Sequence, residues 1–433
     1  MSDLTPAERQ KRIGDVIRVA SGNFLEQYDF FVYGYYAAYI GRVFFPSGDP
    51  LASLMLSLAT FGVGFLMRPL GAIFLGAYID RVGRRKGLIV TLAMMAVGTL
   101  TIAITPGYAT IGIAAPLIIV AGRLLQGFSA GAELGGVSIY LAEIATPGHR
   151  GFYCSWQSAS QQVAVIIAAL IGVALTGSLT PEQMGSFGWR IPLLIGCAII
   201  PLILWLRRSL DETEAFRRMQ HKAHSAGDVF RMLGANWGLV LTGMGLSVLT
   251  TTTFYLITAY TPTYGREALH MDSFGVLVVT LLVGFSNFIW LPVGGAISDR
   301  IGRYPLLFLV PVVTLLVSYP CLTWLVAAPS FGKLLAVVLL FSSFFGLYNG
   351  AMIPLLAEIM PPQVRTAGFS LAFSLATAVF GGFTPLVSTA LIGWTGDRAS
   401  PALWLSFAAA VSLAAVIASR RTAPVVEAAA AMT

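Results

Sequence analysis

The sequence predicts an all-α membrane protein, and three observations support this fold class. Hydrophobic residues make up 56% of the 433 residues and charged residues only 11%, against about 25% in an ordinary soluble domain. The mean hydropathy is +0.78. The apolar runs are long and continuous, whereas a transmembrane β-barrel shows alternating segments of about ten residues. These features exclude a soluble fold, a disordered chain and a disulfide-rich secreted domain.

Twelve apolar stretches are long enough to cross a bilayer as helices, because the hydrocarbon core requires about 20 helical residues. The first six are predicted at 20–44, 51–79, 87–106, 112–141, 151–177 and 190–207. The last six are predicted at 236–264, 273–297, 304–327, 333–356, 366–393 and 401–419. We therefore expect an N-terminal six-helix bundle (1–207), a polar central cytoplasmic loop (208–235) and a C-terminal six-helix bundle (236–433).

Basic residues indicate which side of the membrane each loop occupies. With the N-terminus inside, most of the 27 Lys and Arg residues lie in cytoplasmic segments. The outer segments hold Arg42, Arg190, Arg266, Lys333 and Arg398. Both termini are therefore expected in the cytoplasm. The net charge is +7, but in a membrane protein the location of the charges matters more than their sum, so we expect a lipid bilayer and not nucleic acid as the partner.

The two halves of the sequence repeat each other. The segment Gly76-Ala-Tyr-Ile-Asp80-Arg81-Val-Gly83-Arg84 recurs as Gly295-Ala-Ile-Ser-Asp299-Arg300-Ile-Gly302-Arg303. Leu141-Ala-Glu143-Ile recurs as Leu356-Ala-Glu358-Ile. Two six-span repeats around a central loop are typical of secondary transporters, which alternate access around a site between the halves.

Two segments, 76–86 and Arg123-Leu-Leu-Gln126-Gly127, resemble signature motifs of the major facilitator superfamily. Further segments resemble its metabolite:proton symporter branch, and within it the bacterial citrate and tricarballylate transporters: 21–31, 65–69, 127–136, 155–162, 250–255 and 348–352. Tyr304 departs from the pattern, which usually has an Arg after Arg303. The resemblance implies the major facilitator fold, a multi-pass protein of the bacterial inner membrane, and proton-coupled import of a tricarboxylate.

An anionic substrate would find only two cations deep in the spans, Arg68 and Arg123. A charge at mid-bilayer costs about 2.5–3.5 kcal/mol, so each requires a partner. Arg123 is predicted to bind substrate, because a guanidinium can hold a carboxylate through two hydrogen bonds. The alternative, which the resemblance suggests, is an ion pair between Arg123 and Asp29, and the two contacts can alternate in one cycle. For Arg68, next to Pro69, we expect a structural role.

The coupling proton is expected on a carboxylate, because every histidine lies in a loop: His149, His221, His224 and His270. Glu26 and Asp29 are three residues apart and share a helix face, so repulsion favours one shared proton. Glu133 is a further candidate. Its alternative role is a helix contact among glycines that permit close packing: Gly127, Gly131, Gly135 and Gly136. Sodium could replace the proton, because Asn23 and Gln27 add oxygen ligands, but the resemblance favours protons.

Neutral polar residues within the spans complete the predicted substrate site with Arg123. They are Asn23, Gln27, Ser158, Gln161, Gln162, Tyr255, Tyr348 and Asn349. Thr251, Tyr255 and Thr258 also form a stripe at helical spacing. Any single polar residue of this kind more often makes a hydrogen bond between helices than a contact with substrate. Together they suit a central ligand with several hydroxyl or carboxyl groups.

Two charged clusters at the cytoplasmic ends of the spans are predicted to form a latch when the inner face is closed, because they can pair and cap helix ends. They are Asp80, Arg84, Glu143 and Arg150 in the first half, and Asp299, Arg303, Glu358 and Arg365 in the second. The alternative is that these charges only orient the chain in the membrane.

No enzyme, cofactor or metal site is expected. The sequence has no Gly-x4-Gly-Lys-Ser/Thr loop for a nucleotide, and the spans lack His and Cys groupings. The predicted function is secondary active symport of citrate or a related tricarboxylate with protons, by a monomer. The alternatives are a tricarballylate-specific, dicarboxylate or osmolyte symporter, or sodium-coupled citrate transport. A drug antiporter would instead have an apolar cavity without a deep arginine.

Overall fold

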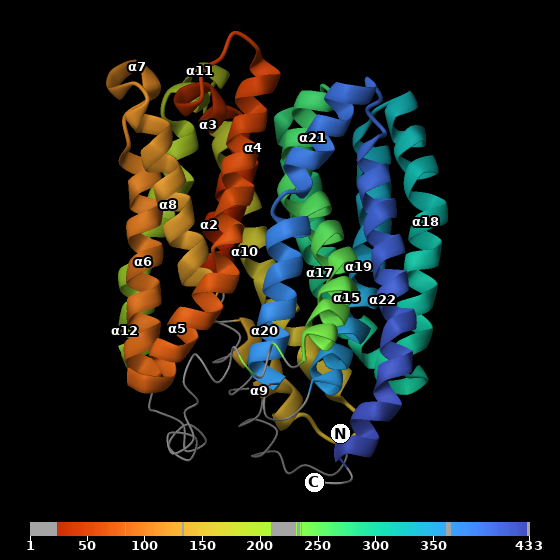
Figure 1. Cartoon of the computed structure of the whole chain (residues 1–433). Helices are drawn as coiled ribbons and strands as arrows, with labels where there is room; N and C mark the ends of the chain where they lie inside the picture. Colours follow the sequence, from red (N-terminus) through yellow and green to blue (C-terminus); the bar gives the residue numbers. More distant parts are fainter. Residues whose placement is uncertain are drawn as a thin grey trace, which may run out of the picture.

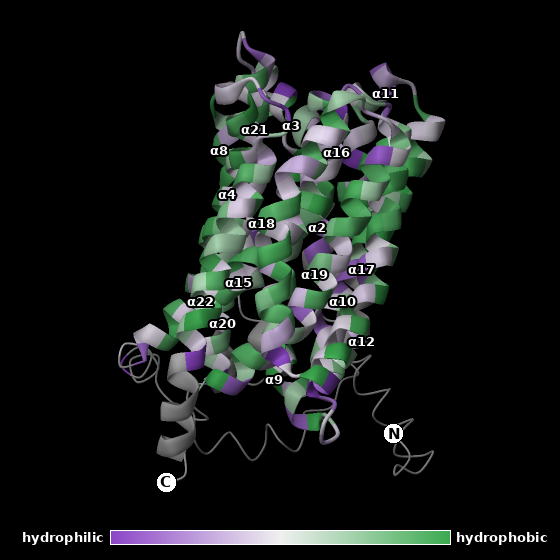
Figure 2. Cartoon of the chain, turned by 90° about the vertical axis from the view of Figure 1, so that its right-hand side faces the viewer, coloured by the Kyte–Doolittle hydropathy of each residue, from purple (hydrophilic) through white to green (hydrophobic). Residues whose placement is uncertain are grey.

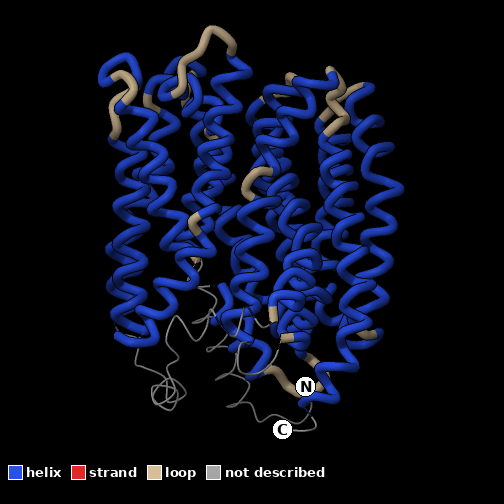
Figure 3. Tube along the Cα trace, in the orientation of Figure 1, coloured by secondary structure: helices blue, strands red, loops and turns tan. Residues whose placement is uncertain are grey.

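The computed structural model describes residues 24–82, 84–131, 134–208, 231, 234, 236–360 and 365–430. These residues form helices that run side by side, and they contain no strand (Figure 1; Figure 3). The helices of the first half are α2 (Phe24–Tyr35), α3 (Ala37–Phe44), α4 (Pro50–Leu66), α5 (Arg68–Val82), α6 (Arg84–Ile104), α7 (Tyr108–Ile111), α8 (Ala114–Ala130), α9 (Leu134–Ile144), α10 (Arg150–Ser178), α11 (Pro181–Ser186), the short 3-10 turn η2 (Gly188–Arg190) and α12 (Ile191–Arg208).

The second half contains five α-helices of 19 residues or more, shorter helical pieces, and three π-helical turns. Its elements are α15 (Trp237–Tyr255), the π-turn η4 (Leu256–Tyr260), α16 (Thr261–Thr263), the π-turn η5 (Tyr264–Ala268), α17 (Ser273–Ile301), α18 (Arg303–Ala327), α19 (Phe331–Ile359), α20 (Arg365–Ala376), the π-turn η6 (Thr377–Gly381), α21 (Thr384–Thr395) and α22 (Pro401–Ala430). In Figure 1 most helices of the first half lie on the left and those of the second half on the right, and α10 lies against α17 between them.

Eight helical segments in the described part of the chain are long and apolar enough to span a membrane. They are Pro50–Leu75, Arg150–Ser178, Trp237–Ala268, Ser273–Ile301, Arg303–Ala327, Phe331–Ile359, Arg365–Thr395 and Pro401–Arg420. Ile89–Ile104, Ala114–Ala130 and Gly188–Ile199 are shorter apolar segments. All of them overlap predicted spans. The all-α membrane class is therefore confirmed, whereas the number of twelve spans stays a prediction, as does the cytoplasmic position of the termini.

The outer surface of the helices is apolar along much of their length (Figure 2). Large apolar side chains stand exposed there, among them Leu316 (69% exposed) and Trp394 (79%). Exposed apolar patches of this extent mark a surface that meets another apolar phase, here the lipid.

A proline break separates α4 from α5 and sets the position of Arg68. Pro69 has no N–H to donate, and its ring crowds the carbonyl of Phe65. The helix breaks at Met67, whose N–H donates to Gly64 O at 3.4 Å, three residues back. Arg68 is then the first residue of α5, so its side chain leaves the helix in the middle of the span.

Glycines let α8 approach α4 and α5 backbone to backbone. A Cβ on Gly127 would lie 1.6 Å from Gly64 O, and one on Gly131 would lie 2.0 Å from Arg68 O. The close packing expected at Gly127 and Gly131 is therefore confirmed. The structural context of Glu133, Gly135 and Gly136 lies outside the residues whose side chains are described.

We expect Gly127→Ala to destabilise the protein by at least about 2 kcal/mol, because the added methyl overlaps a backbone carbonyl that cannot move as a side chain can. Thermal unfolding of the purified protein in detergent measures the effect. Gly177→Ala is the matched control: its Cβ meets nothing closer than 3.7 Å, so this helical glycine should tolerate alanine. An unchanged melting temperature for Gly127→Ala would contradict the packing argument.

Candidate functional site

A small cavity lies at the centre of the molecule and takes its lining from both halves of the chain. Its volume is about 20 Å³, about enough for one water molecule. The first half contributes Gln27, Arg68, Ser158 and Gln161. The second half contributes Thr250, Thr251, Phe254, Tyr255, Phe345, Asn349, Phe373 and Thr377. The cavity thus combines a cation with amides, hydroxyls and aromatic rings.

Five of the predicted substrate-binding residues line this cavity: Gln27, Ser158, Gln161, Tyr255 and Asn349. Two others face neighbouring helices. Gln162 accepts a 3.0 Å hydrogen bond from Asn287 on α17, and the Tyr348 hydroxyl donates to Leu246 O at 2.8 Å. Asn23 lies outside the described residues.

The sequence analysis missed several lining residues, and one of them is charged. Thr250 belongs to a run of four threonines, which is unusual inside an apolar span and was the available signal. Thr377 begins the π-turn η6, which no sequence pattern indicated. Arg68, expected to be structural, lines the cavity, whereas Arg123 does not.

The two buried guanidiniums contact the same aromatic ring. Arg68 Cζ is 4.7 Å from the centroid of the Phe30 ring, and Arg123 Cζ is 4.4 Å from the same centroid. Arg68 also contacts the Phe65 ring at 4.5 Å, and it is only 1% exposed. Such cation–π contacts partly offset the cost of burying a charge. The two guanidiniums thus share the Phe30 ring as a neighbour, and of the two only Arg68 lines the cavity.

Arg123 is fully buried and is held by its own neighbourhood. Its Nη1 donates to Gln126 Oε1 at 2.8 Å, and its Nη2 lies 3.5 Å from Phe61 O. The Tyr33 ring centroid lies 4.6 Å from Arg123 Cζ. The guanidinium is thus surrounded by rings and neutral acceptors.

Asp29 is buried near Arg123 without touching it. Its Oδ2 accepts a hydrogen bond from the Thr99 hydroxyl, and its Oδ1 has no hydrogen-bond partner among the described residues. No ion pair within 4.0 Å joins Asp29 to Arg123, two residues that the structure describes: the Arg123 guanidinium bonds Gln126 and Phe61 O, and Asp29 bonds Thr99. The alternative of a direct Arg123–Asp29 ion pair is therefore not formed in this conformation, because Gln126 and Thr99 lie between the two groups. Gln126 Nε2 donates to Thr99 Oγ1 at 2.9 Å.

The other proton candidates cannot be placed. Glu26 belongs to α2, but its side chain is not among those described, and Glu133 lies outside the described residues. Whether Glu26 and Asp29 share a proton therefore stays a prediction.

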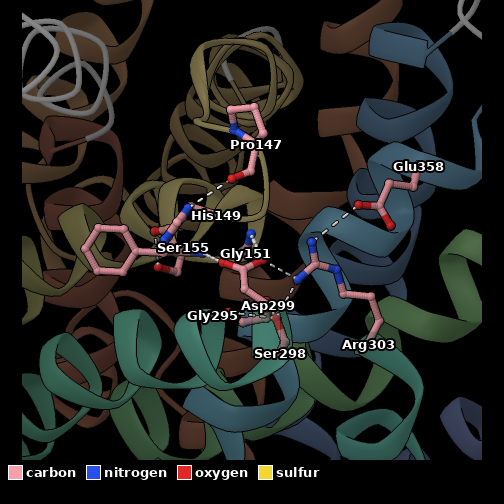
Figure 4. A network of polar contacts seen from close by, with 11 residues as sticks. Pro147, His149, Gly151, Ser155, Gly295, Ser298, Asp299, Arg303 and Glu358 are labelled. Atoms are coloured by element: carbon pink, nitrogen blue, oxygen red, sulfur yellow. Dashed lines mark hydrogen bonds and ion pairs between the residues drawn. The ribbon is translucent and has the colours of Figure 1, made fainter. Parts of the chain in front are cut away.

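At the end of the molecule that is predicted to face the cytoplasm, Asp299 joins the two halves (Figure 4). The Asp299 carboxylate accepts hydrogen bonds from the backbone N–H groups of Gly151 and Phe152 at 2.7 and 2.9 Å. These groups open α10, so a residue of the second half caps a helix of the first. Arg303 Nη1 bonds Asp299 at 2.7 Å, and Arg303 Nη2 bonds Glu358 at 3.4 Å.

The remaining latch candidates have different surroundings. Glu143 and Arg150 line a cavity of about 410 Å³ beside Asp299 and Arg303. Arg365 instead donates to Met360 O at 3.3 Å, close to the C-terminus of α19. The side chains of Asp80 and Arg84 lie outside those described. Of the predicted latch residues described, Asp299 makes the hydrogen bonds that join the two halves, and Arg303 pairs with it. The latch role itself stays a prediction.

The opposite end also joins the halves, by weaker contacts. Arg266 Cζ lies 4.7 Å from the Tyr39 ring centroid, and Arg266 Nε bonds Glu267 at 2.8 Å. Arg42 Nη2 lies 4.0 Å from Glu267 Oε2. Below them, the Phe31 and Phe254 rings meet edge to face at 5.5 Å.

Comparison with known proteins agrees with this geometry. The "Citrate-proton symporter" of Salmonella typhi is 60% identical over 416 residues, which cover 96% of this chain and 96% of that protein. The "Citrate-proton symporter" of Klebsiella pneumoniae is 59% identical and covers 93% and 91%. Both are named as transporters and not as enzymes.

The fold has solved counterparts. The structure of the proton:xylose symporter XylE bound to 6-bromo-6-deoxy-D-glucose matches with a TM-score of 0.73 at 18% identity, covering 96% of both chains. The Major Facilitator Superfamily pattern matches residues 19–385. On this match and on the identity to its transporter relatives, the chain belongs to the Major Facilitator Superfamily.

Proposed function

We propose that this protein imports citrate or a closely related tricarboxylate together with protons, across a bacterial inner membrane and as a monomer. The observation that carries the proposal is the central cavity, in which Arg68 meets amide and hydroxyl groups from both halves. A fixed guanidinium suits a carboxylate, and the neutral groups suit further carboxyl and hydroxyl oxygens. The names of the two bacterial relatives support the same substrate and the same coupling ion.

Arg68 is the first cation that an anion in the cavity would meet. At this depth a carboxylate loses its water, so a charge-assisted hydrogen bond to a guanidinium gains strength from the low dielectric. Arg123 contacts the same Phe30 ring as Arg68 but does not line the cavity. It remains our predicted second contact with the substrate, in a conformation where its guanidinium reaches the site.

Protons offset the charge that the substrate brings. A tricarboxylate carries up to three negative charges, and moving them to mid-membrane uncompensated is very unfavourable. Asp29 is buried close to Arg123 and can take up a proton there. The names of the relatives support protons, and they give no support to sodium.

Transport requires the halves to move. About 20 Å³ admits one water molecule and not a tricarboxylate. We propose that bundles 1–207 and 236–433 rock about the cavity, linked by 208–235. The contacts at the Asp299 end and at the Arg266 end then break alternately, so that the site opens to one side at a time.

The direct test is uptake of labelled citrate and tricarballylate into proteoliposomes under separately imposed proton and sodium gradients. Accumulation driven by a proton gradient is expected. Accumulation driven only by sodium, or no accumulation of either substrate, would contradict the proposal.

Arg68→Gln should raise the KM for citrate about 10- to 100-fold, because a charge-assisted hydrogen bond to the substrate is lost. Initial uptake rates over a range of citrate concentrations measure this effect. Arg190→Gln is the matched control: Arg190 also stacks on a ring, Trp189, but it bonds the carbonyls of Ala103 and Thr105 away from the cavity. A normal KM for Arg68→Gln would remove Arg68 from the site.

Asp29→Asn should abolish accumulation against a gradient and retain citrate exchange, since exchange requires no net proton movement. Uptake driven by an imposed pH gradient and counterflow of labelled citrate are measured on the same vesicles. Full accumulation by this variant would move the coupling role to Glu26 or Glu133.

Asp299→Asn should increase the fraction of molecules whose cytoplasmic end is open. Losing the charged cap on α10 costs about 1–2 kcal/mol, or about a 5- to 30-fold shift between conformations. The shift is measured as the rate at which an impermeant maleimide, applied from the cytoplasmic side, labels a cysteine introduced by Ala142→Cys. The three native cysteines are replaced by alanine in this background.

Asp272→Asn is the matched control for this shift. Asp272 caps α17 within one half, by accepting from Gly275 N at 2.8 Å. It should weaken a helix end and leave the labelling rate unchanged. Equal labelling of Asp299→Asn and the wild type would contradict the latch.

A further inference from the structure

A continuous chain of side-chain hydrogen bonds joins Arg123 to Asp29. Arg123 Nη1 donates to Gln126 Oε1 at 2.8 Å, Gln126 Nε2 donates to Thr99 Oγ1 at 2.9 Å, and the Thr99 hydroxyl donates to Asp29 Oδ2. All four residues are at most 1% exposed. Every donor points from the cation towards the carboxylate, so each bond polarises the next.

The backbone holds this chain in register. Gly98 on α6 and Gly122 on α8 face each other, and a Cβ on Gly98 would lie 2.6 Å from Gln126 Cγ and 2.8 Å from Gly122 O. Only at this short separation can Thr99 and Gln126 meet. Gln126 also belongs to the Arg123-Leu-Leu-Gln126-Gly127 motif, and the proposed transport cycle gives Gln126 itself no role.

Thr99 has two acceptors for one proton. Its hydroxyl can donate to Asp29 Oδ2 or to Met95 O, which lies 3.0 Å away. An ionised Asp29 wins this competition, because a hydrogen bond to a charged acceptor is about twice as strong as one to a neutral acceptor. A protonated Asp29 needs an acceptor instead, and Thr99 Oγ1 is the one in contact.

We propose that Gln126 and Thr99 are positioning residues that report the protonation of Asp29 to the guanidinium of Arg123. When a proton binds Asp29, the carboxyl O–H donates to Thr99 Oγ1, and the Thr99 proton turns to Met95 O. Thr99 Oγ1 then accepts from both Asp29 and Gln126, and two donors on one oxygen weaken each other. Gln126 loosens its hold on Arg123, which is freed to move. No proton is transferred along the chain.

Few other charged or titratable side chains of the described residues lie beside Asp29. The charged and titratable side chains of the described residues that face Asp29 are Arg123 on α8, Cys197 on α12 and Tyr28 on α2 itself. The Tyr28 hydroxyl is engaged with Pro192 O at 2.8 Å. The inference rests on the proposed proton-coupled uptake, and its test separates the two.

Thr99→Val removes the hydroxyl and keeps the shape of the side chain. We expect proton-driven accumulation of citrate to fall about 10- to 100-fold, while citrate exchange in the same vesicles stays within about twofold. Thr99→Ser restores the hydroxyl and should restore accumulation. Gln126→Leu should match Thr99→Val, and the double variant should lose no more than either single variant, because all three break one chain.

Thr101→Val is the control on the same helix, since the Thr101 hydroxyl bonds only Val97 O at 2.7 Å in its own helix. It should behave as the wild type. Accumulation by Thr99→Val equal to the wild type would overturn the proposal. So would an equal loss of exchange and accumulation, because that pattern indicates structural damage.

Infrared difference spectra of the purified protein between low and high pH give a readout that requires no substrate. The carboxyl C=O band that disappears in Asp29→Asn should shift in Thr99→Val and Gln126→Leu, and stay in place in Thr99→Ser and Thr101→Val. An unshifted band in Thr99→Val and Gln126→Leu would refute the positioning role of Thr99 and Gln126. If the band shifts in Thr99→Val and Gln126→Leu but the wild type transports no tricarboxylate, the positioning role of Gln126 and Thr99 stands and the proposed substrate is wrong.

Discussion

The contact of two buried guanidiniums with the single ring of Phe30 is the interaction on which the rest of the site depends. Two like charges repel, and neither Arg68 nor Arg123 has water around it. The Phe30 ring attracts both cations, at 4.7 and 4.4 Å from its centroid, and so partly offsets the cost of burying them. Arg68 lines the cavity, while Arg123 is linked to the Asp29 carboxylate through Gln126 and Thr99.

The two halves contribute different chemistry to the centre of the molecule. The charged residues described there, Asp29, Arg68 and Arg123, all belong to the first half. The second half lines the cavity with neutral groups, such as Thr250, Tyr255 and Asn349. Neutral contacts are weaker and less costly to break than buried ion pairs. A half that supplies only such contacts can move away from an anion that stays held by the other half.

The contacts between halves at the two ends are also of modest strength. At one end Asp299 caps α10 through two backbone N–H groups. At the other, Arg266 lies over Tyr39, and Arg42 lies 4.0 Å from Glu267. Caps and exposed ion pairs each contribute about 1 kcal/mol. Two conformations held by contacts of similar strength remain close in free energy, which is what repeated alternation requires.

The sequence by itself determined the membrane class, the positions of most helices, the repeated motifs and the family, because these follow from long apolar runs and local patterns. It also found the buried charges, since a charge inside an apolar run is visible without a structure. It could not decide which guanidinium reaches the cavity. That depends on the break at Pro69 and on the place of the Phe30 ring, and both are matters of packing. Nor could it place Gln126 and Thr99 between Arg123 and Asp29, because that link forms only where two glycines bring α6 and α8 together.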